Sequence, residues 1–368
     1  MRLFFKYYVQ TFKNIAANSS ILTTLILGVI IYGFFYPTAY QAQKAEALPI
    51  IIVDEERSEL SQSIIQAVSY SPNVEIKQIT GNFLTAEQQV KNQKAEAILY
   101  LPHNLSQSLM HGETGGIGFY LSAAYFVKLK DIALGMGTAI EHSLAEQLEK
   151  FGQISHFKFE QSIHSTPLFN PLSGYASYIF PAVSPLIIHQ TILIGLSMLI
   201  ASYREKFWQP SATEFFATFA SVLTIGCIGC LYYFGFIFWL YDLPRGGNFW
   251  GMCLAIPIYI SYTVAFSMLL ASFFDMLERA GHVLVVTSIP IFLLSGVAFP
   301  HESMPVLIQY LAWFLPTTSG LHMFIQLNQM GVPTWIVIPK LLYIGVFGLV
   351  CLALAYYRLV IAPRPASQ

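Results

Sequence analysis

The chain contains 368 residues, of which 55% are hydrophobic and 11% are charged, and its formal net charge is −1 at pH 7. This composition is too apolar for one soluble domain, and a nearly neutral chain without a run of Lys and Arg does not suit a nucleic-acid partner. Seven stretches contain no Lys, Arg, Asp or Glu: 14–43, 161–203, 215–241, 246–274, 280–301, 303–339 and 341–357. A charge at the centre of a bilayer costs roughly 2.5–3.5 kcal/mol, so these runs indicate segments that cross a membrane.

The first 18 residues are amphipathic at helical spacing. Polar and basic side chains fall on one face: Arg2, Lys6, Gln10 and Lys13. We therefore predict a cytoplasmic amphipathic helix over residues 1–18, lying on the membrane surface, and a first transmembrane helix over residues 19–40. A cleaved signal peptide is the alternative, since small residues gather around Ala45 and Ala47. The uncleaved anchor is favoured because the amphipathic segment is long for a signal sequence.

Most of the charge lies in residues 44–160, which hold 14 acidic and 9 basic side chains. Apolar runs of strand length occur in this block at 49–53, 74–79, 97–101 and 117–121. Helix-like stretches follow them at 58–68, 85–91, 105–110 and 128–150. Strands that alternate with helices predict a small α/β domain, and the charge predicts that water surrounds it. We expect an α/β ectodomain over residues 41–172.

Residues 173–368 are expected to form a transmembrane domain with helices 2–6 and a cytoplasmic C-terminal tail. Five apolar runs are close to the ~20 residues needed to cross a bilayer. These runs are 175–200, 214–240, 249–274, 283–299 and 335–357. Prolines cut the stretch 303–339, so we predict two short re-entrant or interfacial helices, at 306–315 and 318–330. The expected fold is an α-helical polytopic membrane protein with six transmembrane helices, re-entrant outer helices and an inserted α/β ectodomain.

The basic residues of the short loops predict the orientation. Six crossings put both termini on one side, and that side carries eight basic residues: Arg2, Lys6, Lys13, Arg204, Lys206, Arg279, Arg358 and Arg364. The opposite side carries Arg245 and Lys340. Because short cytoplasmic loops are enriched in Lys and Arg, we expect a multi-pass protein of the cytoplasmic (inner) membrane with both termini in the cytoplasm. The ectodomain is then periplasmic or extracellular.

The sequence contains few groups that could carry chemistry. It has no P-loop, no HExxH motif and no Asp or Glu in the interior of a predicted span. Intramembrane proton relays are usually built from carboxylates, so a proton-driven carrier is disfavoured, and any energy is expected to come from another chain. We expect no cofactor and no metal bound by this chain. His189, beside Gln190, is the most polar intramembrane point, and structural packing is the favoured interpretation of it.

The segment between the second and third spans is typical of a docking surface for a cytoplasmic partner. It combines charges of both signs with large aromatic side chains, which suit anchors surrounded by a polar rim. The residues are Tyr203, Arg204, Glu205, Lys206, Phe207 and Trp208. An ordinary interfacial loop is the alternative. Asp275, Glu278 and Arg279 form a second candidate contact, for which a solvated loop is the favoured interpretation.

The stretch Leu294–Pro300, followed by Met304–Pro305 and Leu315–Thr317, resembles the signature of ABC type-2 exporter permeases. In that family these residues lead from the fifth span through re-entrant outer helices, here marked by Gly296, Pro300, Pro305 and Pro316. The resemblance covers essentially the full length. The layout resembles in particular the subgroup of this family that carries a large ectodomain after the first transmembrane helix.

The resemblance implies a permease subunit that pairs with a second copy or a paralogue and with two separate ATP-binding cassette subunits. ATP and Mg would then be bound by those partner chains. The family's ATPase contact corresponds to residues 203–210, although Arg204-Glu205-Lys206 lacks the Gly-Thr that usually follows. A periplasmic adaptor on the ectodomain and membrane lipids are further expected partners.

An apolar route for a hydrophobic or amphipathic substrate is expected to involve residues of the second and fifth spans: Tyr178, Phe180, His189, Phe292 and Ser295. Pro181, Pro185 and Pro290 are candidate hinges because proline frees backbone carbonyls within a helix. Drugs, lipids, peptides and siderophores all fit such a route. Two other functions stay open at this point: a membrane-anchored sensor or scaffold whose ectodomain binds a ligand or protein, and a membrane enzyme built around His189.

Overall fold

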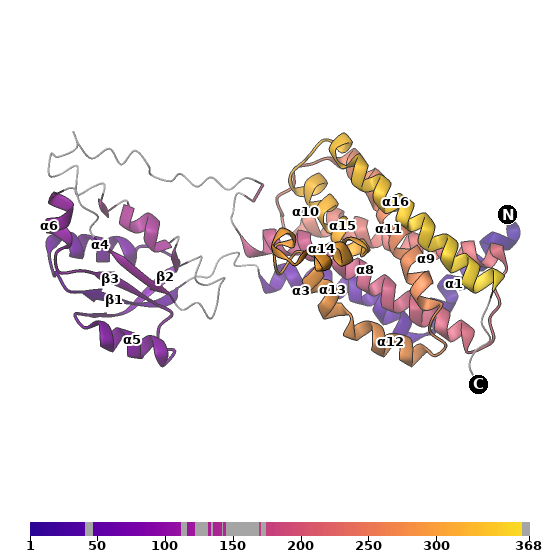
Figure 1. Ribbon diagram of the computed structural model, residues 1–368, viewed down its shortest axis with the longest axis horizontal. Helices are drawn as coiled ribbons and strands as arrows, with labels where there is room; N and C mark the ends of the chain where they lie inside the picture. Colours follow the sequence, from indigo (N-terminus) through magenta and orange to yellow (C-terminus); the bar gives the residue numbers. More distant parts are fainter. Residues whose placement is uncertain are drawn as a thin grey trace. The chain divides into compact units, whose positions relative to one another are not determined.

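The computed structural model describes residues 1–40, 47–111, 116–121, 132–133, 135–141, 143–144, 169–170 and 174–362. The chain divides into two compact units. Residues 1–41 and 167–368 form the helical unit, and residues 42–166 form the inserted unit (Figure 1).

The inserted unit is built on a four-stranded sheet with strand order β2-β1-β3-β4. The strands are β1 (Leu48–Asp54), β2 (Val74–Thr80), β3 (Ala97–Leu101) and β4 (Gly118–Leu121). β1 pairs in parallel with both β2 and β3, whereas β4 runs antiparallel to β3. Because parallel neighbours need helical crossovers, the alternating pattern of the sequence leads directly to this topology.

Helices cover both faces of the sheet. Ile50 and Ile52 of β1 pack on one side with α4 (Glu59–Ser69) and with described residues between 132 and 144. Ile51 and Val53 pack on the other side with α5 (Phe83–Lys91). Figure 1 shows α4 and α5 on opposite faces. A central strand buried on both faces explains why β1 reads as a continuous apolar run.

Two carboxylates hold the loops at the carboxyl ends of β1 and β3. Asp54 accepts a hydrogen bond from Ser61 Oγ (2.9 Å). Glu56 accepts from the backbone nitrogen of Ser106 (2.7 Å) and from its hydroxyl (2.9 Å), and also from Ser58 Oγ (2.6 Å). Ser106 lies in α6 (Leu105–Met110), so Glu56 joins the loop after β1 to the helix that follows β3.

The predicted α/β class of the inserted unit is confirmed, and all four predicted strands are present within two residues of their expected bounds. The predicted helix over 128–150 lies largely outside the described residues. Its described residues, 132–133, 135–141 and 143–144, are helical.

The described part of the helical unit contains six helices that are long and apolar enough to cross a membrane. They are α2–η1–α3 (Ser19–Leu22, Thr23–Leu27, Gly28–Ala39), α8 (Tyr175–Arg204), α9–η2–α10 (Ala212–Leu231, Tyr232–Ile237, Phe238–Leu240), α11 (Phe249–Ala271), α12–α13 (Leu277–Val286, Ser288–Leu294) and α16–η5 (Thr334–Tyr356, Tyr357–Ile361). The predicted polytopic helical fold is confirmed. α8 is buried along almost its whole length, which suits a helix that is apolar on every side.

The predicted fifth span, 283–299, is misplaced at both ends. The helix begins at Leu277, with Glu278 and Arg279 in its first turn, and hydropathy alone assigns these charged residues to a loop. The helical segment ends at Leu294. Gly296 has a φ of +87°, a left-handed conformation that favours glycine and turns the chain out of the helix.

Short helices fill the stretch between the fifth and sixth spans, as predicted. They are η3 (His301–Ser303), α14 (Val306–Trp313), α15 (Pro316–Phe324) and the π-helical turn η4 (Ile325–Gln329). Pro305 lies at the N-cap of α14, and Pro316 is the first residue of α15, where its missing N–H leaves no helical hydrogen bond unmade.

The N-terminal helix α1 (Arg2–Ala17) packs on α9. The hydroxyl of Tyr8 donates to Thr224 Oγ1 (2.9 Å), and Ser221 Oγ donates to the carbonyl of Tyr8 (3.1 Å). Thr11 and Ile15 are buried. The predicted amphipathic helix therefore contacts another helix over part of its length.

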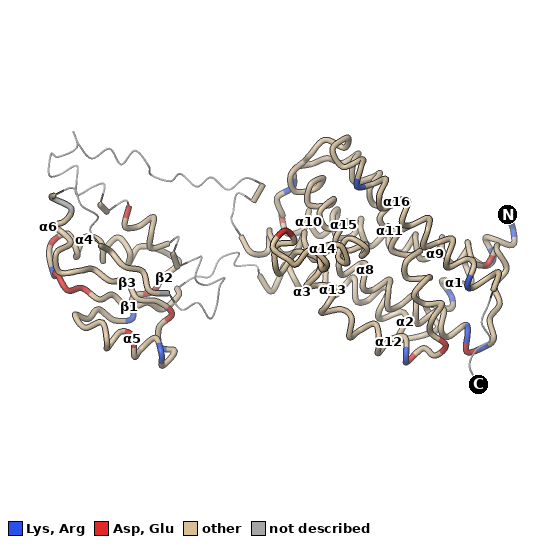
Figure 2. The backbone as a smooth tube through the Cα atoms, viewed as in Figure 1, with Lys and Arg blue, Asp and Glu red and all other residues tan. Residues whose placement is uncertain are grey.

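Charged residues of the helical unit gather mostly at its two ends, and the middle is almost free of them (Figure 2). The N-terminus and the end of η5 lie at the same end of this unit (Figure 1). We call this end of the helical unit, which holds the N-terminus and the end of η5, the charged end. It also holds the loop from α8 to α9 and the loop from α11 to α12.

Candidate functional site

The end of α8 and the turn that leads to α9 contain the residues predicted to couple to an ATPase. Trp208 is anchored, because its Nε1 donates to Glu214 Oε1 (2.8 Å) and its ring lies 5.1 Å from the ring of Tyr203. Lys206 and Phe207 are exposed, Phe207 by 78%. Phe207 also has a φ of +59°, which costs energy for a residue other than glycine. The turn therefore exposes the side chains of Lys206 and Phe207, while the contacts of Trp208 hold its backbone in place.

Arg204 joins this turn to the loop between α11 and α12. Its Nη2 lies 2.8 Å from Asp275 Oδ1, and the Arg204 side chain is only 10% exposed. Its Nη1 donates to the carbonyls of Ser272 (2.6 Å) and Phe274 (3.1 Å). The planar guanidinium can make these contacts at once, which an ammonium cannot do with the same geometry.

Glu205 holds the first turn of α12. Its Oε1 accepts a hydrogen bond from the backbone nitrogen of Leu277 (2.8 Å). The first amides of a helix have no partner within the helix, and a negative charge there is favourable. The end of α8 is therefore fastened to the start of the fifth candidate span.

Arg358, near the end of the last helix, reaches the same loop. Its Nε donates to Ser272 Oγ (2.7 Å), and its Nη2 donates to the carbonyl of Ser272 (3.3 Å). Its guanidinium carbon lies 3.9 Å from the centre of the Phe273 ring, within the range of cation–π attraction. The helix α1 also contacts the end of α8, because Asn14 Nδ2 donates to the hydroxyl of Tyr203 (2.8 Å).

We call Arg204, Glu205, Ser272, Asp275 and Arg358 the junction. Sequence reasoning named Arg204, Glu205 and Asp275 but placed them in two separate loops, and the structure brings these together. It missed Ser272 and Arg358 as contacts, because a serine at a helix end and an arginine after a span carry no local signal. Glu278 and Arg279 are exposed in the first turn of α12.

The residues predicted to line a substrate route do not come together in either of the two grooves described below. Phe180, His189 and Ser295 are fully buried, whereas Tyr178 is half-exposed. Phe292 alone among the five lines a groove described below. Tyr178 does meet the fifth-span region, since its hydroxyl donates to the carbonyl of Val297 (3.1 Å).

His189 is enclosed by helices. Its ring centre lies 6.1 Å from that of Phe266 on α11. Apart from the adjacent Gln190 amide, no described group offers its ring nitrogens a hydrogen-bond partner. Near it, Tyr259 of α11 donates to the carbonyl of Pro185 (2.7 Å), so a polar bond supports the proline-containing part of α8. No nucleophile or acid partner for His189 is present among the described residues, and within them no cluster of His, Cys, Asp and Glu could hold a metal.

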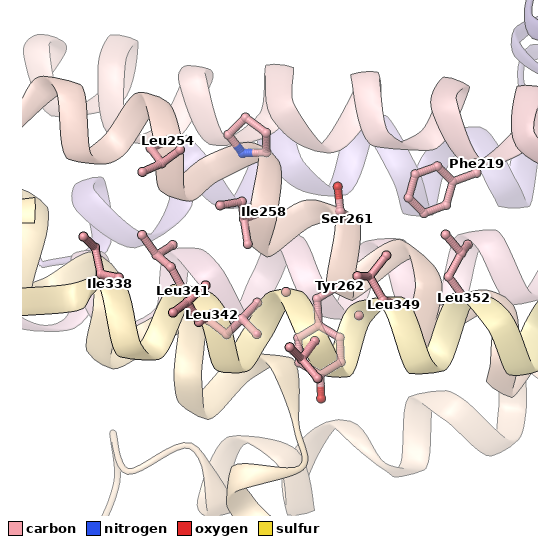
Figure 3. Close-up of a pocket in the computed structure, with 15 residues that line it drawn as sticks. Phe219, Leu254, Ile258, Ser261, Tyr262, Ile338, Leu341, Leu342, Leu349 and Leu352 are labelled. Atoms are coloured by element: carbon pink, nitrogen blue, oxygen red, sulfur yellow. The ribbon is translucent and has the colours of Figure 1, made fainter. Parts of the chain in front are cut away.

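Two grooves lie along the helices. The first, of about 410 Å³, lies between η1–α3, α8 and α12–α13 and includes Gln190 and Phe292. The second, of about 640 Å³, lies mainly between α11 and α16 and is lined by apolar side chains such as Leu349, with Ser261 as one of few polar groups (Figure 3). We call them the first and second groove. Both fall in the size range of small-molecule sites.

The signature residues Gly296, Pro300, Pro305 and Pro316 set the path of the outer helices. Beside them, the rings of Trp313 and His322 stack with centres 5.8 Å apart, and His301 lies 6.3 Å from His322. Burial lowers the pKa of His322 below its usual value, and the charge of Lys340 and then His301 act in the same direction, while Glu302 opposes them. A neutral His322 is therefore the form that this packing favours.

Comparison with known proteins identifies the class. Residues 19–357 match the family described as "ABC-2 family transporter protein", and the chain belongs to this family. It is also similar to the probable multidrug ABC transporter permease YbhR of Escherichia coli strain K12. The two are 23% identical over 300 residues, which cover 79% of this chain and 80% of that protein. The protein of that name from Escherichia coli O157:H7 matches equally.

The resemblance drawn from the signature residues is thus confirmed. The chain is a multi-pass ABC transporter permease, and a permease subunit is not itself the catalytic subunit of such a transporter.

Proposed function

We propose that this chain is the membrane-spanning subunit of an ABC exporter. It moves a hydrophobic or amphipathic substrate out of the cytoplasm or the inner leaflet, and a separate ATP-binding cassette subunit hydrolyses ATP with Mg. The observation that carries the proposal is the junction. It fastens the exposed turn at Lys206 and Phe207 to the loop before α12, so that a push on the turn reaches two candidate spans together.

The charged end is proposed to face the cytoplasm. Among the described residues, seven basic residues of short loops and termini belong to this side, against two on the other, and the positive-inside rule then applies. In this orientation the junction faces the compartment that contains ATP, and the inserted unit lies in the periplasm or outside the cell. A periplasmic adaptor would meet the inserted unit there.

In the proposed mechanism, closure of the ATPase subunits moves the turn, and Arg204 transmits this motion to Ser272 and Asp275. Glu205 carries it to the first turn of α12. Ion pairs and hydrogen bonds to backbone atoms can transmit this motion because their geometry fixes the relative position of the two segments that they join. Pro181 and Pro185 in α8 then allow the helix to bend.

The substrate is proposed to move along the side of the helical unit where Phe292 and Tyr178 lie. A second permease copy or a paralogue completes this route. An apolar route agrees with the charge-free spans, and the name of the Escherichia coli relative, a probable multidrug permease, supports an amphipathic cargo.

A cross-linking experiment tests the proposal. Phe207→Cys places a thiol on the exposed turn, and Trp250→Cys, at a residue 79% exposed near the start of α11, is the matched control. We expect Phe207→Cys to cross-link to a co-purified ATP-binding cassette subunit and Trp250→Cys not to do so. Purification of the chain without any nucleotide-binding partner, together with a ligand held by the inserted unit, would instead support the sensor or scaffold function.

A further inference from the structure

The second groove lies on the apolar surface of two membrane-spanning helices, α11 and α16 (Figure 3). None of the 15 residues that line it is charged. Leu342, Val346 and Leu349 belong to the lining, and each is more than half exposed. The groove is therefore continuous with the surface that α16 exposes along its span.

Two tryptophans mark one end of this groove. Trp250 lies four positions before Leu254 on α11, and both are exposed. Trp335 lies three positions before Ile338 on α16, and both are exposed there as well. Residues at these spacings share a helix face, and tryptophan is enriched where a span reaches the boundary between lipid and water. The faces of α11 and α16 that line the groove are therefore the faces that meet lipid.

The length of the groove suits a hydrocarbon chain. Ile338 and Leu352, both in its lining, are 14 positions apart on α16, which is about 21 Å at 1.5 Å per residue. One leaflet of the hydrocarbon core is about 15 Å deep, so a lipid acyl chain fits along the groove. The volume is about 640 Å³. Side chains around an empty space of this size would lack packing contacts on that side, so an occupant is expected.

The two glycines of the lining do not favour a second transmembrane helix as this occupant. Close helix pairs in membranes rely on several small residues along one face. Gly348 already serves packing within the chain, because a Cβ there would lie 3.2 Å from the Cα of Tyr262. A Cβ at Gly345 would meet nothing within 4 Å, but it lies between the large side chains of Leu342 and Leu349. A flexible chain can fill the space between such side chains.

The groove offers little to a polar group. Two side chains in its lining carry a hydroxyl, Ser261 and Tyr262. The hydroxyl of Tyr262 is already used, since it donates to the carbonyl of Phe314 (2.6 Å). Ser261 alone cannot replace the hydration of a charged or strongly polar group. The uncharged lining therefore complements hydrocarbon.

One wall of the groove also holds an outer helix. Phe314, which accepts from Tyr262, is the C-cap of α14. Tyr343 of α16 donates to the adjacent carbonyl, that of Trp313 (2.9 Å). Hydrocarbon packed against the ring of Tyr262 would restrict the ring, and with it the hydroxyl that attaches α14.

From these observations we propose that the second groove binds the acyl chain of a membrane lipid. The chain enters from the end marked by Trp250 and Trp335, lies along Gly345 and Leu349, and supports the attachment of α14 through Tyr262. This lipid is a resident part of the protein and not its cargo. The groove contains no residue of the junction and none of those predicted to line a substrate route, so the inference is independent of the proposed function.

Photolabelling in lipid nanodiscs tests the site. The probe is a phosphatidylcholine with a diazirine midway along one acyl chain, and the full-length permease is irradiated without ATP. Mass spectrometry maps the labelled residues, with Val350 as the reference, since it is an exposed apolar neighbour of Leu349 outside the groove. A chain in the groove contacts protein on more than one side. We therefore expect Leu349 to be labelled about fivefold more than Val350.

Three variants refine the labelling test. Gly345→Phe fills the open space and should lower labelling of Leu349 to the level of Val350. Ser261→Leu narrows the groove from α11 and should act in the same direction, which separates filling from a folding defect at one position. Gly235→Phe is the matched control, because Gly235 also faces open space but lies in η2, outside both grooves. It should leave the labelling unchanged.

Amide hydrogen exchange tests the support of α14. Phosphatidylcholine added to the delipidated permease in detergent should slow exchange of the α14 amides about fivefold. Gly345→Phe should abolish this response to lipid. Tyr262→Phe keeps the ring but removes the hydrogen bond, so it should abolish the response and leave the labelling of Leu349 unchanged.

Equal labelling of Leu349 and Val350 would overturn the proposal, as would labelling of Leu349 that persists in both Gly345→Phe and Ser261→Leu. A disulfide between two copies that carry Leu349→Cys would do the same, because a second copy would then cover the groove. Exchange of α14 that does not respond to lipid would overturn its support by the lipid. None of these measurements uses ATP or an ATPase partner, so failure of the proposed exporter function would leave every outcome unchanged.

Discussion

Arg204 and Arg358 donate hydrogen bonds to the same carbonyl oxygen, that of Ser272, from the ends of two different helices. Ser272 is the C-cap of α11, where helix carbonyls lack partners and the helix dipole favours positive charge. The C-terminal end of α11 therefore contacts both α8 and the last helix. Arg358 lies 86 positions after Ser272 in the sequence. The contacts at Ser272 therefore join the ends of α8, α11 and the last helix to one another at the charged end.

Arg204→Gln should destabilise the protein by about 1–3 kcal/mol, because it leaves Asp275 and two carbonyls without their cation in a partly buried place. Arg204→Lys should be intermediate, since lysine keeps the charge but not the fork of donors. Thermal unfolding in detergent measures both. Equal stability of Arg204→Lys and the wild-type protein would show that the charge alone matters.

Glu205→Gln should weaken the start of α12 by about 1 kcal/mol, because the bond to the amide of Leu277 loses its charge. The readout is faster hydrogen exchange of the first amides of α12. Glu278→Gln is the matched control, an exposed acidic residue of the same first turn. If both variants exchange equally fast, the helix dipole alone accounts for the effect.

Gly320→Ala should disrupt the packing of α15 on α11. A Cβ at this position would collide with the ring of Tyr259, which is fully buried and hydrogen-bonded to Pro185. Overpacking of this kind costs typically 1–3 kcal/mol. Gly345→Ala, in α16, meets open space and should be neutral or slightly stabilising. Melting temperatures of the two variants decide this, and an unchanged value for Gly320→Ala would contradict the packing described here.

Glu56→Gln should loosen the inserted unit. The carboxylate accepts from Ser58 and twice from Ser106, and loss of its charge should cost about 1–3 kcal/mol of local stability. Hydrogen exchange of α6 in the full chain is the measurement. Glu59→Gln, an exposed acidic residue in the first turn of α4, provides the comparison, and equal protection of α6 in both variants would refute the role of Glu56.

Acidification should destabilise the outer helices through His322. Its pKa in the folded protein is lowered by burial, so the unfolded state binds the proton more readily. The stability that neutral His322 contributes is present above its unfolded pKa of about 6.5 and is lost as the pH falls through that value toward the folded pKa. His322→Phe keeps a ring against Trp313 and should flatten the dependence of melting temperature on pH between about 7 and 5. An equal slope in the variant would exclude His322 as the cause.

The spans and the strands could be read from the sequence because both depend on local properties. A run such as 341–357 is apolar whatever its neighbours are, and the short continuous apolar runs at 49–53 and 97–101 identify buried strands without knowledge of the sheet. The start of the fifth span could not be read in this way, since Glu278 and Arg279 are charged yet belong to the helix. Its end depends on Gly296, whose positive φ is a property of the folded backbone.

By itself, then, the sequence determined that this protein crosses a membrane six times, carries an α/β domain after the first crossing and resembles ABC type-2 permeases. Only the tertiary structure decided that Arg204 and Arg358 meet at Ser272, and that Asp275 pairs with Arg204 beside it. The physical reason is that hydropathy is summed along neighbouring residues, whereas a hydrogen bond between residues 86 positions apart depends on how whole helices pack.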